Sequence, residues 1–217
     1  METERSPRPS AGGAASRVVG THAVLLELDG LEQVWAYAAE AMRRRAAGQL
    51  GPASDIVAGA RTVLFDGLAD PAAFCDELAS WSPDPAAASS GRLHELEIRY
   101  DGEDLEVVAE QLGMGREAFI ELHCAREHRV AFLGFAPGFA YLAGLAPHRV
   151  ARRSTPRTRV EAGSVGVADE YTGIYPRASP GGWQLIGRCD AWLWDLDRQS
   201  PARFAPGDRV RFVPAAA

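Results

Sequence analysis

The chain has 217 residues, of which 47% are hydrophobic and 24% are charged, and its formal net charge at neutral pH is −6. This composition supplies enough apolar material for a packed core, and the length fits one large domain or two small ones. The negative net charge argues against nucleic acid or an anionic membrane as a main partner. The chain contains arginine but no lysine, a bias to which we attach no function.

The N-terminal segment, residues 1–17, is rich in Pro, Ser, Gly and Ala and lacks a continuous apolar run, which predicts a disordered tail rather than a signal peptide. The three cysteines, Cys75, Cys124 and Cys189, are widely spaced without a C-x-x-C pattern, as is typical of reduced thiols. No stretch approaches the roughly 18 apolar residues of a membrane span. We therefore expect a soluble, cytoplasmic protein.

Strands and helices alternate in the first half of the chain. Residues 22–28 are a predicted strand, and the apolar residues of 31–42 recur at helical spacing. A second strand is expected over residues 56–65, a second helix from Pro71, and a third strand over residues 93–100. This β-α-β-α-β order predicts a small α+β unit, with a flexible connection at residues 82–91.

The second half changes character. Two short helices are expected at residues 104–112 and 116–125, followed by a strand at 129–135. Short β-prone pieces then alternate with Gly/Pro turns as far as residues 208–213. Regularly spaced short strands predict a closed or partly closed antiparallel barrel, although periodicity alone does not distinguish a barrel from a sandwich.

The most informative stretch runs from residue 134 to residue 188 and is dense in glycine and proline. Glycine allows positive φ and close backbone approach, and proline fixes φ, so this density predicts rigid, specifically shaped turns. Shaped loops on a scaffold are where binding sites lie. The motifs, in chain order, are GFAPGFAYL (134–142), STPRTR (154–159), GSVG (163–166), TGIYP (172–176) and SPGGWQLIGR (179–188).

These motifs, in this order, resemble the allophanate hydrolase subunit 1 family. That family includes the B subunit of the bacterial ATP-dependent 5-oxoprolinase, an inhibitor of a sporulation kinase, and one half of the carboxyltransferase region of urea carboxylase. The resemblance covers roughly residues 20–214. It implies an α+β protein with a ferredoxin-like N-terminal domain, residues 18–91, followed by a cyclophilin-like β-barrel domain, residues 92–217.

Two residues are candidate catalytic groups. His123 coincides with a histidine of the family pattern, and histidine is the commonest acid/base side chain at neutral pH. Tyr141 lies in the first motif, where its hydroxyl is a candidate orienting donor. A histidine at a helix end can instead cap carbonyl groups, and this alternative stays open.

The other candidates are binding residues. Arginine forks bind carboxylate or phosphate, aromatic rings can wall a pocket, and exposed Gly-Gly N–H groups can hold an anion. The alternatives are a solvated arginine-rich loop, aromatic rings that fill the barrel core, and a simple Gly-Gly turn. The predicted substrate-binding residues are Phe135, Pro137, Gly138, Phe139, Arg157, Arg159, Thr172, Tyr175, Gly181, Gly182 and Trp183.

One segment departs from the family pattern. Where members typically have Gly-Gly-Gln before Thr-Gly-Ile-Tyr-Pro, this chain has Asp169-Glu170-Tyr171, and Glu161 stands where proline is usual. Two acids and a bulky ring in place of glycines change both loop flexibility and charge. The identity of the substrate is therefore open.

The resemblance implies a subunit of an ATP-dependent cyclic amide hydrolase that opens 5-oxo-L-proline to L-glutamate. It implies ATP shared with a partner, a second cyclophilin-like subunit of the C type, and a further oxoprolinase subunit. No metal-ligand spacing or Walker A loop occurs in the sequence, so we expect the isolated chain to be inactive. The alternatives are a regulatory protein that inhibits a sensor histidine kinase and an allophanate hydrolase or urea carboxylase type of subunit.

Overall fold

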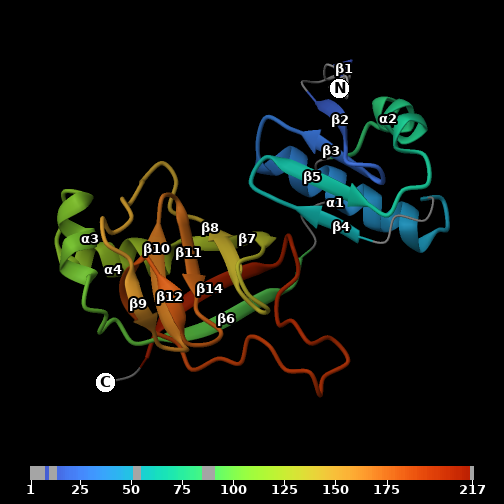
Figure 1. Cartoon of the computed structure of the whole chain (residues 1–217). Helices are drawn as coiled ribbons and strands as arrows, with labels where there is room; N and C mark the ends of the chain where they lie inside the picture. The colour runs from blue at the N-terminus through green and yellow to red at the C-terminus, as the bar shows by residue number, and fades with distance from the viewer. Residues whose placement is uncertain (1–7, 10–13, 51–54, 85–90, 216–217) are drawn as a thin grey trace. The chain divides into compact units, whose positions relative to one another are not determined.

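The computed structural model describes residues 8–9, 14–50, 55–84 and 91–215. The chain divides between Ser90 and Gly91 into two compact units (Figure 1). Each unit has its own sheet and its own hydrophobic core. Six residues of the predicted flexible connection, 85–90, lie outside the described residues.

The first unit contains an antiparallel sheet with strand order β1-β2-β3-β5-β4. Both helices contribute to the core on one face of it, α1 against β4 and β5 and α2 against β2 and β3. The bounds are β1 (Arg8–Pro9), β2 (Ala15–Val19), β3 (Ala23–Glu27), α1 (Leu31–Ala46), β4 (Asp55–Ala58), β5 (Thr62–Asp66) and α2 (Pro71–Ala79).

Three sequence predictions for this unit need correction. The tail predicted over residues 1–17 is not disordered at Ala15–Arg17, which pair with β3, while residues 1–7 and 10–13 lie outside the described residues. The strand predicted at 56–65 is two strands, because the chain turns where Gly59 N–H donates to the carbonyl of Thr62 at 2.8 Å. The strand predicted at 93–100 pairs in the other sheet, so the order β-α-β-α-β is wrong.

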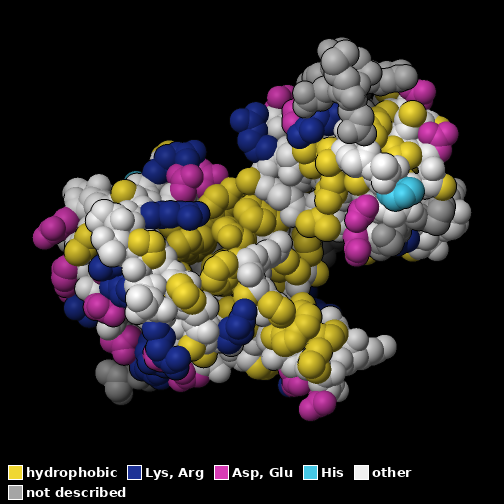
Figure 2. All heavy atoms as spheres, viewed as in Figure 1, with side chains coloured by type: hydrophobic (Ala, Val, Ile, Leu, Met, Phe, Trp, Pro, Cys, Tyr) yellow, Lys and Arg dark blue, Asp and Glu magenta, His cyan; other side chains and the backbone are white. Residues whose placement is uncertain are grey.

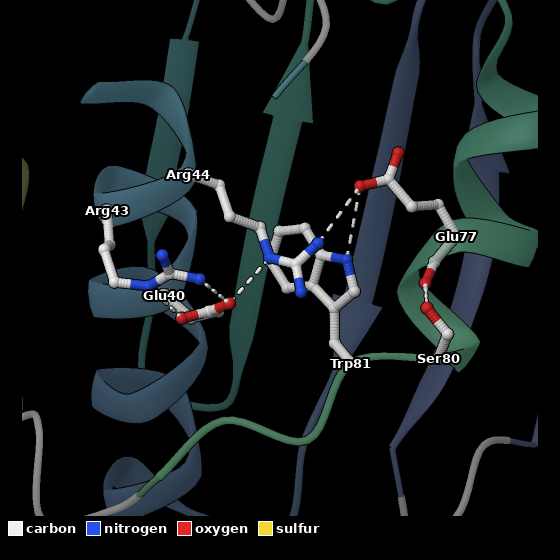
Figure 3. Close-up of polar contacts among 6 residues, drawn as sticks. All are labelled: Glu40, Arg43, Arg44, Glu77, Ser80 and Trp81. Carbon is white, nitrogen blue, oxygen red and sulfur yellow. Dashed lines mark hydrogen bonds and ion pairs between the residues drawn. The ribbon is translucent and has the colours of Figure 1, made fainter. Parts of the chain in front are cut away.

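The two helices of the first unit meet around a buried tryptophan (Figure 3). The guanidinium of Arg44, on α1, lies 4.4 Å from the ring centroid of Trp81, just beyond α2. Arg44 pairs with Glu40 at 2.6 Å and with Glu77 at 3.6 Å, and Trp81 Nε1 donates to Glu77 at 3.3 Å. Cation–π contacts and hydrogen bonds of this kind tie the ends of the helices together.

The helix α2 begins at a well-formed N-cap. The side chain of Asp70 accepts hydrogen bonds from the backbone N–H groups of Ala72 and Ala73, and Pro71 occupies the first helical position. An N-cap carboxylate and an N1 proline are the expected start of a helix, and they confirm the predicted helix from Pro71.

The second unit contains a seven-stranded mixed sheet with order β13-β10-β11-β8-β7-β14-β6 and a separate pair, β12-β9. Among the described strands of this sheet, only the β14–β6 pair is parallel. The bounds are β6 (Leu93–Ile98), α3 (Leu105–Gln111), α4 (Arg116–Ala125), β7 (Glu127–Leu133), β8 (Ala140–Ala143), β9 (Arg157–Val160), β10 (Ser164–Ala168), β11 (Tyr171–Ile174), β12 (Ser179–Gly181), β13 (Gln184–Arg188) and β14 (Arg209–Pro214). The two predicted helices of this half are confirmed.

The two edges of this sheet meet at one end. Arg99, which follows β6, and Arg188, which ends β13, exchange two backbone hydrogen bonds of 2.9 Å. A Cβ added to Gly187 would lie 2.1 Å from the carbonyl oxygen of Arg99, so only glycine permits this approach. The sheet is therefore curled and partly closed around a core that includes Val130, Leu142, Val165 and Ile186. We call this meeting of the edges the seam.

Candidate functional site

The first motif forms a tight loop between β7 and β8. Phe135 and Gly138 both have left-handed backbone conformations, with φ of 67° and 84°. Three short-range backbone hydrogen bonds within residues 134–139 fix the loop. A Cβ on Gly138 would lie 2.9 Å from the Cβ of Trp194, so this glycine allows the loop to pack against the segment after β13. The phenyl ring of Phe135 is 59% exposed.

Two glycines on adjacent strands leave room for aromatic rings on the outer face of the sheet. Gly166 on β10 is the register partner of Gly173 on β11. A Cβ on Gly173 would lie 2.6 Å from the Phe139 ring and 3.0 Å from the Trp183 ring, and one on Gly166 would lie 3.1 Å from Trp183 Cβ. The rings of Phe139 and Trp183 therefore lie directly on the backbone of these strands, where they are buried in a second core cluster on the face opposite the main core.

Seven aromatic side chains contact one another on this face, and we call them the aromatic floor. Tyr141 is central: its ring lies 4.2 Å from Phe132, 5.2 Å from Phe139, 5.5 Å from Trp183 and 5.9 Å from Tyr171, between centroids. Figure 2 shows hydrophobic side chains gathered over β7, β8 and β11. The floor consists of Phe132, Phe135, Phe139, Tyr141, Tyr171, Tyr175 and Trp183.

The three tyrosine hydroxyls of the floor differ in their environment. Tyr175 is buried, which raises the pKa of its phenol, and the hydroxyl is hydrogen-bonded to the backbone of Trp183. Tyr141 and Tyr171 are half-buried, and their hydroxyls make no hydrogen bond with any residue that the structure describes. Burial, then the charges of the neighbouring Glu170 and Asp169, raise the pKa of Tyr171. A phenol hydroxyl is a hydrogen-bond donor, so the hydroxyls of Tyr141 and Tyr171 can donate to a ligand.

The predicted catalytic residue His123 lies on the opposite face, inside the core, with none of its side chain exposed. Its Nδ1 is 2.7 Å from the Tyr100 hydroxyl and its Nε2 is 3.0 Å from the hydroxyl of Thr172, a predicted substrate-binding residue. Burial, and the nearby His128, lower the pKa of His123 well below its usual range. The structure places both predicted residues in a buried hydrogen-bond network that holds α4 to β11.

The predicted arginines lie at the seam. The side chain of Arg157 is largely buried, and its Nη2 is 2.9 Å from Oδ1 of Asp104 and 3.1 Å from Glu103. Arg153 also pairs with Asp104 at 2.9 Å, and the backbone N–H of Leu185 donates to Asp104 Oδ2 at 2.7 Å. Burial would raise the pKa of Asp104, but these hydrogen bonds and charges outweigh it and lower the pKa. Asp104 therefore fixes both arginines and the strand β13.

Arg157 and Arg159 border a cavity of about 340 Å³. Arg159 forms an exposed pair with Glu161 at 2.7 Å. The cavity is lined by as many acidic as basic side chains: Asp101, Glu103 and Glu161 against Arg157, Arg159 and Arg188.

The predicted glycines Gly181 and Gly182 have different roles. A Cβ on Gly181 would lie 2.4 Å from the Tyr175 hydroxyl, so this glycine makes room for that ring. The carbonyl of Gly182 accepts a hydrogen bond from the N–H of Arg153 at 2.9 Å. Pro137 is exposed in the loop beside Gly138.

The sequence-predicted site thus divides into three places. The floor brings together Phe135, Phe139, Tyr141, Tyr175 and Trp183, the core holds His123 and Thr172, and the seam holds Arg157 and Arg159.

Sequence reasoning missed Phe132, Tyr171 and Asp104. Alternation along the strands is the signal that finds the first two, because Phe132 is the register partner of Tyr141, and Tyr171 is two residues before Gly173. Asp104 is 53 residues from Arg157 and has no comparable signal.

In the departure Asp169-Glu170-Tyr171, the two acids form the turn between β10 and β11, and Tyr171 begins β11. Asp169 has a positive φ of 52°, a conformation in which glycine is the favoured residue and Asp is tolerated. Arg149 pairs with both acids, with Asp169 through Nη1 and with Glu170 through Nη2 at 3.1 Å. Backbone hydrogen bonds between Val150 and Asp169, of 2.9 and 2.7 Å, complete the contact.

The fold and the site define an α+β protein in which a curled, partly closed sheet carries an aromatic outer face. The chain belongs to the family described as carboxyltransferase domain, subdomain C and D, whose model matches residues 14–204. The family resemblance that the motifs predict is confirmed.

Relatives agree with this membership. The chain is 45% identical to the B subunit of 5-oxoprolinase from Escherichia coli O157:H7 over 138 residues, which cover 62% of this chain and 63% of that relative. The solved structure of TTHA0988 is 34% identical with a TM-score of 0.72, and the match covers 91% of this chain and 40% of that one. Urea carboxylase of Kluyveromyces lactis shares the fold, with 18% identity and a TM-score of 0.70 over 97% of this chain and 23% of that one. In the part of the chain that the structure describes, no helix has the length and apolar character of a membrane span.

Proposed function

We propose that this chain is the B subunit of an ATP-dependent 5-oxoprolinase, which opens 5-oxo-L-proline to L-glutamate. The observation that carries the proposal is the 45% identity with a 5-oxoprolinase B subunit. The aromatic floor supports it chemically, because a small lactam has a flat amide and an apolar ring edge. Aromatic rings with a few polar groups are the expected lining for such a ligand.

Within the reaction, this chain binds and orients the lactam. The ring lies against the floor, and the hydroxyl of Tyr141 donates to the lactam oxygen. That oxygen gains negative charge when the amide carbon is attacked, so the hydrogen bond is stronger in the transition state than in the ground state. The buried rings of Phe139 and Trp183 contact the ring of Tyr141 and hold it in place.

We propose that Arg157 and Arg159 do not bind the nucleotide. Arg157 forms an ion pair with Asp104, and Arg159 forms one with Glu161. Three acidic side chains line the same cavity as these two arginines. Three carboxylates and three guanidinium groups line this cavity, so it offers a phosphate no excess of positive charge. We therefore propose that the groups that bind ATP come mainly from a partner protein, and we derive no step at the nucleotide from this chain.

We further propose that the chain works with a second cyclophilin-like subunit and a further oxoprolinase subunit, in the cytoplasm, and that it is inactive alone. The exposed apolar side chains Trp194, 42% exposed, and Leu196, 77% exposed, support a protein partner because burial would remove their apolar surface from water.

The ferredoxin-like and cyclophilin-like assignments of the two units are part of the same proposal. The run β3-α1-β4-β5-α2 and the seam support them.

The test is reconstitution. The chain is mixed with its cognate subunits, and ATP-dependent formation of glutamate from 5-oxoproline is measured for the complex and for each component alone. Activity in the complex and none in the chain alone is the expected result. Full activity of the isolated chain contradicts the proposal that the chain needs its partner subunits. A stably assembled complex without activity contradicts the proposal that 5-oxoproline is the substrate.

Inhibition of a sensor histidine kinase is the second candidate function. The exposed side chain of Phe135 is the observation in its favour, because exposed aromatic side chains are typical anchors of protein interfaces. Kinase autophosphorylation measured with and without an excess of the chain separates the two functions. The likeness to urea carboxylase shows a shared fold and does not favour the third alternative.

A further inference from the structure

The ring of Tyr171 lies on the aromatic floor at the start of β11. Its centroid is 5.8 Å from Phe132 and 5.9 Å from Tyr141, and both contacts are edge to face. Tyr171 pairs in register with Ala143 on β8, two residues beyond Tyr141 on the same strand. The two tyrosines are therefore diagonal neighbours on one face of the sheet.

The turn before Tyr171 is held from outside the hairpin. Arg149 binds the carboxylates of Asp169 and Glu170, and the backbone of Val150 bonds that of Asp169 in both directions. A two-residue turn with such anchors has little freedom to move the residue that follows it. The position of Tyr171 at the start of β11 is thus supported mainly by the two backbone hydrogen bonds between Val150 and Asp169, to which the exposed pairs of Arg149 add.

We propose that Tyr171 contacts the substrate and determines which ring size the site accepts. This inference rests on the proposed function and deepens it. Tyr171 and Tyr141 provide two phenol donors on one apolar floor, and neither hydroxyl bonds any described residue. The ligand class that fits is a small cyclic amide with a second acceptor group, since one donor meets the amide oxygen and the other the second acceptor. A shorter side chain at position 171 would vacate the volume of the phenol ring, and a ligand with a larger ring could then occupy that volume.

The experiment measures binding to the full chain by ligand-observed NMR titration. The probes are 5-oxoproline, 2-pyrrolidinone, which lacks the carboxylate, and the six-membered homologue 6-oxopiperidine-2-carboxylate. The variants are Tyr171→Phe, which removes only the hydroxyl, and Tyr171→Ala, which removes the ring. Tyr37→Phe, in the first unit, is the matched control, and circular dichroism verifies that every variant is folded.

We expect Tyr171→Phe to weaken 5-oxoproline binding roughly 3- to 10-fold, the worth of one hydrogen bond, and to leave 2-pyrrolidinone less affected. Tyr171→Ala should reduce or reverse the preference for the five-membered over the six-membered ring. Tyr37→Phe should match the wild type. Unchanged dissociation constants and an unchanged ring preference in both Tyr171 variants overturn the inference.

Turnover of the reconstituted complex separates this inference from the proposed function. A complex that opens 5-oxoproline equally well with and without Tyr171 overturns the inference and leaves the function standing. A complex that does not open 5-oxoproline, while the chain binds a lactam in a manner that depends on Tyr171, supports the inference and overturns the function. Binding of no lactam by chain or complex overturns both.

Discussion

His128 donates a hydrogen bond from Nε2 to the backbone carbonyl of His123, at 3.1 Å, inside the core of the second unit. This bond fixes the tautomer and leaves Nδ1 of His128 without a proton. Nδ1 is buried and has no hydrogen-bond partner among the described residues, and it lies against Gly144, where an added Cβ would be only 2.5 Å away. The two imidazole rings are 4.6 Å apart, so a charge on either opposes a charge on the other.

Acid should therefore destabilise the second unit before it titrates most carboxylates. Burial lowers the pKa of His128 from 6.5 to about 4. The unfolded chain binds the proton more readily than the folded chain does. The contribution of neutral His128 to the free energy of unfolding is therefore fully present above pH 6.5 and is lost as the pH falls toward 4. The shift corresponds to roughly 3 kcal/mol. Urea unfolding at pH 7.5 and pH 4.5 measures the loss.

The variant His128→Phe serves as the comparison for this prediction. It keeps a ring at the position and removes the titrating group, so its stability should depend less steeply on pH between 6.5 and 4. Equal pH dependence in the wild type and the variant would show that His128 is not the group responsible.

Asp104→Asn should destabilise the chain more than any exposed charge substitution at the seam. Asp104 is buried and accepts from Arg153, Arg157 and the Leu185 N–H, so the change leaves two guanidinium groups without their shared carboxylate. Removal of one partner from a buried ion pair typically costs about 3–5 kcal/mol. The change in unfolding free energy in urea is the measurement.

The matched control is Glu161→Gln, which breaks the exposed pair with Arg159. Surface pairs contribute about 1 kcal/mol or less, so this variant should stay close to the wild type. A similar, small loss in both variants would mean that Asp104 does not hold the seam.

Gly173→Ala should disrupt the packing of the aromatic rings against β11. The new Cβ would lie 2.6 Å from the ring of Phe139, which is itself held by Trp183 and Tyr175, so the ring cannot simply move aside. Overpacking of this kind costs about 1–3 kcal/mol and should also weaken lactam binding. Thermal unfolding and the NMR titration measure the two effects.

Gly115→Ala, at a glycine whose added Cβ meets nothing within 4 Å, is the control for steric crowding. It should cost less than about 1 kcal/mol and leave lactam binding unchanged. Equal effects of the two glycine substitutions would contradict close packing of the rings on β11.

Most helices and strands could be predicted from the sequence, but the face of the sheet on which a given side chain lies could not. The helices at 104–112 and 116–125 follow from local apolar spacing, and the motifs identify the family. Whether Thr172 faces the core or the floor depends on the register of β11 with β8 and β10, which is set by long-range pairing. Arg157 looked like a free anion-binding group because its carboxylate partner, Asp104, precedes it by 53 residues.

Tyr141→Phe tests the floor as the substrate site. The substitution keeps the ring and its contact with Phe132 and removes only a hydroxyl that no described residue engages, so folding should be unaffected. In the reconstituted complex we expect kcat to fall roughly tenfold or more, because a hydrogen bond to an oxygen that gains charge contributes about 1.5–3 kcal/mol. KM should change less, since the ground-state carbonyl is neutral. His148→Ala, outside the floor, should retain full turnover, and Arg157→Ala should lower stability along with activity because Arg157 pairs with Asp104. Equal turnover of Tyr141→Phe and His148→Ala would place the substrate site elsewhere on the chain or on a partner.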